Sequence, residues 1–101
     1  MDVIFDESKQ KVPIYSWAED LDTEAKRQLQ DTASLDIVHH HVAAMADAHL
    51  GLGATIGSVF GTIDAVIPSA VGVDIGCGMC AMPTANEWRE FEPKRDDFLN
   101  N

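Results

Sequence analysis

Long apolar stretches, cysteines and basic residues are all scarce in this chain of 101 residues. No apolar run is long and uncharged enough to span a bilayer, so we expect no membrane partner. The first residues, MDVIFDESKQK, lack an apolar segment after a basic start, so we expect no secretory signal and a cytoplasmic location. With only two cysteines, the chain is not a disulfide-dense secreted scaffold.

Basic side chains are outnumbered by acidic ones, seven against seventeen, which gives a formal net charge of -10. Such a surface repels phosphate backbones, so the chain alone is not expected to grip RNA, and no DNA partner is expected. The same charge suits a segment that binds a divalent metal or rests on a basic partner.

The hydrophobic pattern predicts a single α+β domain with more strand than helix. One main helix should open at Asp22 or Thr23. Its apolar face repeats at i, i+4 spacing over Leu21, Ala25, Leu29 and Ala33.

Strands are expected on both sides of this helix. The first covers residues 12–17, where Pro13 favours an edge position, and residues 1–11 before it should fray. The remaining expectations are strands at 40–45, 55–62, 65–68 and 70–74, a loop at 47–53, a glycine turn at 76–78 and an irregular charged tail from 85.

The stretch from Val73 to Met79 is the most informative for chemistry. Asp74 stands three residues before Cys77, and glycines on both sides of Cys77 permit the close backbone approach that would bring carboxylate and thiolate together. Two such ligands can begin a metal site but cannot complete one. Spacing alone leaves open an alternative, in which Cys77 is a buried packing residue in a tight turn.

Cys77 and Cys80 also have the C-x-x-C spacing of redox proteins. In a thioredoxin-like fold this motif begins a helix that lowers the pKa of the first thiol, but no convincing amphipathic helix follows here. A small C-x-x-C redox or metal-binding protein is therefore the second interpretation.

Two histidine-containing segments are weaker candidates. Asp47 and His49 can form a ligand pair or an acid–base pair, or they can be an Asx turn with an exposed histidine. The tract at residues 39–41 is all histidine, but neighbouring side chains in a strand point to opposite faces, so we interpret it as mainly structural. Gly51, Gly53 and Gly57 match a dinucleotide loop only loosely.

The run VAAMADAHLGLGATIGSVFGTIDAVIPSAVGVDIGCGM, residues 42–79, strongly resembles the N-terminal core of the RtcB family of RNA ligases. Its last fifteen residues, AVIPSAVGVDIGCGM, are the most specific element. A weaker likeness extends the resemblance to about residues 12–84 and leaves a divergent tail at 85–101. The resemblance implies one partial domain with the strand-rich N-terminal part of that fold.

The family resemblance also implies an activity. Members join an RNA 3′-phosphate or 2′,3′-cyclic phosphate to a 5′-hydroxyl, using GTP and two Mn²⁺ ions. It implies that Asp74 and Cys77 are metal ligands, and that Asp47, in a D-x-H-x-G motif, orients the histidine that carries GMP. A thiolate ordinarily favours a softer ion, so Zn²⁺ should compete with Mn²⁺.

The sequence also departs from the family pattern. Ala46 stands where Pro is usual, Leu52 where Lys is frequent, and Thr62-Ile63-Asp64 where the family has Thr-Lys-Gly. The resemblance places the other ligands and the guanylylated histidine downstream of Asn101, so the partner expected is the missing C-terminal part of a ligase. The 101 residues alone are expected to be inactive, and a truncated non-catalytic remnant is a further alternative.

Overall fold

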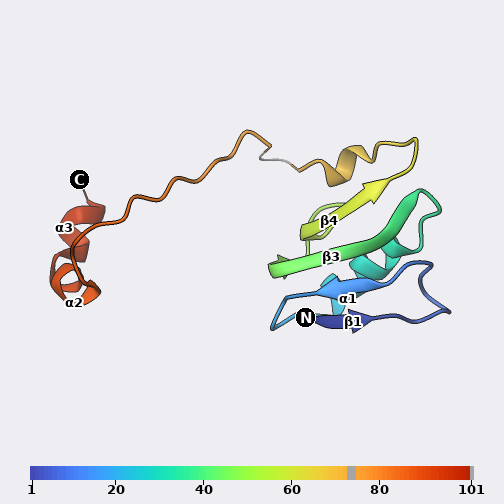
Figure 1. The fold of residues 1–101 in the computed structure, drawn as a ribbon, viewed down its shortest axis with the longest axis horizontal. Helices are drawn as coiled ribbons and strands as arrows, with labels where there is room; N and C mark the ends of the chain where they lie inside the picture. Colours follow the sequence, from blue (N-terminus) through green and yellow to red (C-terminus); the bar gives the residue numbers. More distant parts are fainter. Residues whose placement is uncertain (73–74, 101) are drawn as a thin grey trace.

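The computed structural model describes residues 1–72 and 75–100, apart from the side chain of Phe98. A four-stranded mixed sheet with strand order β1-β2-β3-β4 dominates this part of the chain (Figure 1). The strands are β1 (Asp2–Ile4), β2 (Ile14–Ser16), β3 (Val38–His49) and β4 (Ile56–Thr62). The outer pairs are antiparallel, whereas β2 and β3 are parallel.

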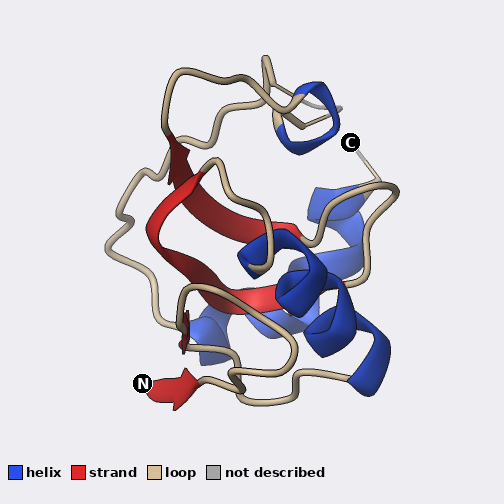
Figure 2. Ribbon diagram, turned by 90° about the vertical axis from the view of Figure 1, so that its right-hand side faces the viewer, coloured by secondary structure: helices blue, strands red, loops and turns tan. Residues whose placement is uncertain are grey.

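The parallel pair is joined by α1 (Thr23–Ala33), which completes a β-α-β unit and covers one face of the sheet (Figures 1 and 2). Asp22 caps the helix, since its carboxylate accepts a 2.7 Å hydrogen bond from the Ala25 amide. The predicted apolar face is confirmed: Ala25, Leu29 and Ala33 are fully buried, and Leu21 packs against the core.

The core lies between α1 and the sheet. Alternate residues of the strands face the helix, as the two-residue period of a strand requires. The cluster comprises Ile14, Leu29, Ala33, Val38, Val42, Ala44 and Ala48, with Ile4, Val12, Ala18, Leu21 and Phe60 packed around it. These contacts connect β2, α1, β3 and β4, so the core depends on residues far apart in the sequence.

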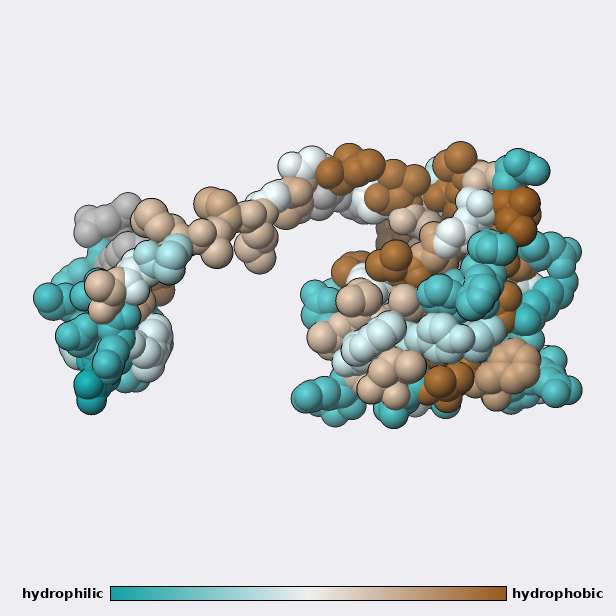
Figure 3. All heavy atoms as spheres, in the orientation of Figure 1, coloured by the Kyte–Doolittle hydropathy of each residue, from teal (hydrophilic) through white to brown (hydrophobic). Residues whose placement is uncertain are grey.

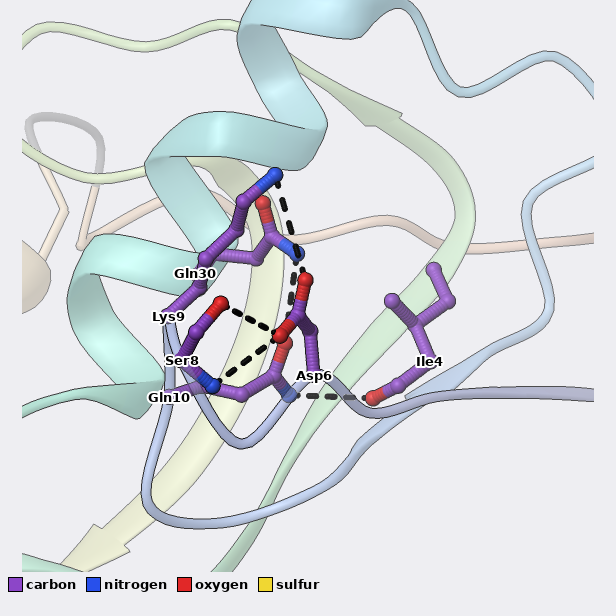
Figure 4. Close-up of polar contacts among 6 residues, drawn as sticks. All are labelled: Ile4, Asp6, Ser8, Lys9, Gln10 and Gln30. Atoms are coloured by element: carbon purple, nitrogen blue, oxygen red, sulfur yellow. Dashed lines mark hydrogen bonds and ion pairs between the residues drawn. The ribbon is translucent and has the colours of Figure 1, made fainter.

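The N-terminal residues do not fray as expected. Residues Asp2–Ile4 pair with β2, and Gln10 is buried behind them. The Gln10 amide donates to the Ile4 carbonyl at 3.0 Å and accepts from Gln30 of α1 at 3.3 Å (Figure 4). It also donates to the Val12 carbonyl at 2.9 Å. Since β1 covers β2 on one side and β3 covers it on the other, the edge position expected from Pro13 is also wrong.

Two further expectations need correction, and part of another lies outside the described residues. The strand expected at 40–45 extends to His49, so the loop begins later than predicted. The described part of 65–72 contains no strand, but a 3-10 helix, η1 (Pro68–Ala70), because Pro68 has a φ suited to a helical first turn. Val73 and Asp74, the end of the last expected strand, lie outside the described residues.

The tail is helical rather than irregular. It contains α2 (Trp88–Phe91), η2 (Glu92–Lys94) and α3 (Arg95–Leu99). Residues 77–84 form an extended, exposed stretch between the sheet and these helices (Figure 1). The radius of gyration of 18.1 Å reflects this separation, since a compact domain of this length has about 13 Å.

Candidate functional site

Asp47 and His49, both in the D-x-H-x-G motif, lie near the end of β3 and are exposed. The Nδ1 atom of His49 lies 2.8 Å from the backbone carbonyl oxygen of Asp47. A carbonyl only accepts, so Nδ1 carries the proton in the neutral ring and Nε2 keeps its lone pair. The ring contacts the backbone rather than the Asp47 carboxylate, so this geometry is not that of an acid–base pair.

The loop after β3 is held by a side chain of α1. Gln28 donates from Nε2 to the Gly51 carbonyl at 2.8 Å, while its Oε1 accepts from the Gly51 amide and from the Thr55 hydroxyl, both at 3.1 Å. One amide therefore satisfies three polar groups of a turn that cannot satisfy them internally. This clamp fixes the path of the chain from His49 into β4.

Close backbone approach at β4 also shapes the surroundings of Asp47. Gly57 has a φ of 80°, which disfavours any side chain, and a Cβ there would lie 3.0 Å from Cα of Ala48 and 3.3 Å from Oδ1 of Asp47. Glycine at this position therefore lets β4 pass beside Asp47 without displacing its carboxylate.

A shallow cavity of about 480 Å³ adjoins this region, between β4 and η1. Its lining is apolar or neutral and includes Leu52, Thr55, Gly57, Ser69 and Ile75. Exposed apolar side chains also gather on the segment after β4 (Figure 3). The cavity offers shape and apolar surface, and among the described residues no acidic, basic or thiol side chain lines it.

Of the two proposed metal ligands, only Cys77 lies among the described residues. Cys77 and Cys80 are both free and exposed, so the interpretation of Cys77 as a buried packing residue is wrong. Asp74 lies outside the described residues. Within residues 1–72 and 75–100, no three His, Cys, Asp or Glu side chains are grouped closely enough to hold a metal ion together. The described residues thus supply the Cys77 thiol as a proposed ligand, but not a complete ligand set.

The redox interpretation gains no structural support. In a thioredoxin-like site the C-x-x-C motif begins a helix whose N-terminus stabilises the thiolate. Here the extended stretch containing Cys77 and Cys80 is followed by a helix only at Trp88. The geometric feature that would activate one of these thiols is therefore missing from the described segment.

Sequence reasoning missed the clamp residues. Gln28 and Thr55 were interpreted only as a helix former and a strand residue, and their side-chain role depends on two segments meeting in space. Gly57 gave a weak signal, since it stood in a glycine-rich run.

In the described part of the chain, every helix is too short or too polar to cross a membrane.

Comparison with known proteins identifies the family. The model of the tRNA-splicing ligase RtcB family matches residues 28–101, from within α1 to the last residue. RNA-splicing ligase RtcB of Escherichia coli strain K12 is 49% identical over 78 residues, which cover 75% of this chain and 19% of that protein. No solved structure gave a significant match.

Other relatives give the same result. RNA-splicing ligase RtcB2 of Escherichia coli strain ATCC 25922 is 41% identical over 68 residues, 67% of this chain and 17% of that protein. The tRNA-splicing ligase RtcB of Methanococcus maripaludis is 33% identical over 85 residues, 81% of this chain and 18% of that protein. The chain therefore belongs to the RtcB family, and it spans about a fifth of the length of these relatives.

Proposed function

We propose that this chain supplies the N-terminal part of an RNA ligase that joins an RNA 3′-phosphate, or a 2′,3′-cyclic phosphate after opening, to a 5′-hydroxyl. The observation that carries the proposal is the family match over residues 28–101. The relatives named as RNA-splicing ligases support an RNA substrate. In this reaction GMP from GTP activates the 3′-phosphate, and the 5′-hydroxyl then displaces GMP to form the phosphodiester.

The proposed roles of the chain's own residues are those that the family resemblance implies. Asp47 would orient the histidine that carries GMP. Its exposed carboxylate beside the clamped loop suits that task, because Gln28 and Gly57 fix the backbone on both sides of it. Asp74 and Cys77 would hold Mn²⁺, which when bound neutralises charge on the transferring phosphate.

The isolated chain should not perform the reaction. The family resemblance gives none of its four histidines the role of the guanylylated residue or of a ligand to the ligase metal ions. Incubation of the chain with GTP, Mn²⁺ and RNA carrying 3′-phosphate and 5′-hydroxyl ends should give neither ligated RNA nor a protein–GMP adduct. Either product would show that the chain holds a complete active site.

A chimaera tests the positive claim. The matching N-terminal segment of the Escherichia coli K12 relative is replaced by residues 12–84 of this chain, and ligation is measured with the same RNA. We expect ligation in the chimaera. Cys77→Ala should lower the rate by about two orders of magnitude or more, because it removes a proposed metal ligand.

Cys80→Ala is the matched control, since this thiol is equally exposed and lies three residues away. It should leave the rate within a fewfold of the parent chimaera. Equal losses from the two substitutions would favour the C-x-x-C interpretation. A folded chimaera, confirmed by circular dichroism, that does not ligate would contradict the proposal.

A further inference from the structure

An imidazole cluster lies at the start of β3, whereas Asp47 lies near the end of the same strand. A regular strand would point consecutive side chains to opposite faces, but the pairing of β3 with β4 shifts register between His39 and Val42, and His40 has a φ of 67°. As a result, the Nδ1 atoms of His40 and His41 lie 3.0 Å apart. The expectation that neighbouring side chains diverge here is therefore wrong for this pair.

Neighbouring contacts position both rings. The His41 ring stacks on Tyr15 of β2, with centroids 4.9 Å apart and an interplanar angle of 29°. The His40 ring meets His41 edge-on, at 5.2 Å and 85°. A positive φ is uncommon for residues other than glycine, although histidine tolerates it better than most, and such a conformation often marks a functional constraint. The pair is thus held on a strand beside the buried Val42.

We propose that His40 and His41 form a two-imidazole site for a divalent transition metal, Cu²⁺ in the first place and Ni²⁺ next. The two Nδ1 atoms are 3.0 Å apart, so with metal–nitrogen bonds of about 2.0–2.1 Å they subtend an angle of about 95°. That angle is close to the right angle of tetragonal Cu²⁺ and Ni²⁺ sites, and smaller than the tetrahedral angle that Zn²⁺ prefers.

The protonation states are compatible with this site. Without a metal ion, an Nδ1–H of one ring donates to the Nδ1 lone pair of the other, and the tautomers decide which ring is the donor. To bind a metal, both rings adopt the neutral form with the proton on Nε2, so the bridging proton moves to the other nitrogen of its own ring through solvent. His40 is exposed and His41 half-buried, so both the ion and water can reach the pair. Water completes the coordination.

The test uses the full chain carrying Cys77→Ser and Cys80→Ser, because Cu²⁺ oxidises free thiols. Cu²⁺ alone is titrated and followed by calorimetry and by electron paramagnetic resonance. We expect one equivalent of Cu²⁺ to bind before any other, with a spectrum that shows coupling to two ring nitrogens, and affinity that falls in the order Cu²⁺, Ni²⁺, Zn²⁺. Binding without nitrogen coupling would overturn the proposal.

Substitutions then assign the ligands. His40→Asn keeps a residue that tolerates positive φ, and His41→Gln keeps a polar side chain. Each should weaken Cu²⁺ binding roughly tenfold or more, since a chelating ring is lost. His49→Gln is the control, because its Nδ1 is engaged with a carbonyl, and it should change the affinity less than about threefold. Equal losses at His49, or none at His40 and His41, would mean diffuse attraction to the acidic surface.

Paramagnetic broadening tests the same site without a substitution in the pair. With substoichiometric Cu²⁺, the amide signals of residues 39–42 and the ring signals of Tyr15 should broaden first. Broadening spread over the acidic residues, or centred elsewhere, would refute the site even if the variants failed to fold.

Discussion

The regions before and after residues 73–74 contain similar apolar side chains, but among the described residues only the first region buries them in a core. Every buried hydrophobic residue of the described chain lies between Ile14 and Ala48, where β2, α1 and β3 form a common core. After that gap, Ile75 is 76% exposed, Met79 is 100% exposed and Leu99 is 70% exposed. Side chains become buried where segments distant in the sequence pack together. The tail helices α2 and α3, of four and five residues, pack mainly on their sequence neighbours, so an apolar side chain such as Leu99 stays exposed.

The residues that identify the family most specifically are therefore not the residues that are best packed in this chain. The run at 65–79 is the most specific part of the family resemblance, yet its described residues form one short 3-10 helix and are largely exposed. The specificity of the motif therefore does not reflect packing in this chain, whereas the β-α-β unit contains the buried apolar core that stabilises the fold.

The sharpest test of the contrast compares two leucines. Leu29 is fully buried between α1 and the sheet, whereas Leu99 of α3 is exposed. Leu29→Ala should lower the free energy of unfolding by about 2–5 kcal/mol, through lost burial and a residual cavity. Leu99→Ala should change it by less than about 0.5 kcal/mol. Urea unfolding followed by circular dichroism measures both, and similar losses would mean that the tail packs on the core.

The second test concerns the clamp. Gln28→Met keeps the volume of the side chain but removes its three hydrogen bonds to Gly51 and Thr55. We expect a loss of about 1–3 kcal/mol in unfolding free energy, because the turn's polar groups lose their partners. Hydrogen exchange at the Gly51 amide should accelerate more than exchange in α1.

Arg27→Met is the control for that change, since Arg27 is the exposed neighbour on the same helix. Its effect should stay within about 0.5 kcal/mol. If Gln28→Met left the Gly51 amide fully protected, the clamp would not hold the loop.

Two glycines of β4 provide a third, smaller test. Gly57 has a positive φ and lies against Ala48, whereas a Cβ at Gly61 would meet nothing within 4 Å. Gly57→Ala should cost about 1–2 kcal/mol from the left-handed backbone, and more if β3 cannot give way. Gly61→Ala should be neutral or slightly stabilising, because alanine reduces the entropy of the unfolded chain. Equal effects would contradict the close approach at Asp47.

The regular features were predictable because they repeat in the sequence. The i, i+4 spacing of Ala25, Leu29 and Ala33 and the capping Asp22 located α1, and the strand at 55–62 was recognised from its composition. Short elements were not predictable in this way. β1 has only three residues among charged neighbours, and its stability depends on pairing with β2 and on the buried Gln10.

The site was less predictable than the fold. Asp47 is a candidate through the family motif alone, and its role stays a prediction. Gln28 acts across a separation of 23 residues and has no local signal. The register shift at His40 arises from pairing with β4, so strict alternation gave the wrong geometry. Both the Gln28 clamp and the geometry at His40 depend on contacts between segments distant in the sequence, which local patterns do not reveal.

The smallest expected effect is a pH dependence at Asp6. Hydrogen bonds from the Ser8 hydroxyl (2.6 Å) and the Ser8 amide (3.0 Å) lower the pKa of the Asp6 carboxyl below its usual value, with a minor contribution from Lys9 (Figure 4). A lowered folded-state pKa stabilises the protein above the unfolded pKa, and this contribution disappears as the pH falls through the folded value. Solvent screens this exposed turn, so the effect should be slight.

Asp6→Asn tests this linkage, because asparagine keeps the shape of the side chain and cannot ionise. The parent chain should be the more stable of the two at pH 6–7, and the difference should shrink below about pH 4, where the carboxyl becomes protonated. Ser8→Ala should flatten the dependence, since it removes the hydroxyl that contributes most to the shift. Urea midpoints measured from pH 7 to pH 3 provide the comparison. A difference that grew as the pH fell would have the wrong sign, and would mean that the Asp6 carboxylate is destabilised in the folded turn.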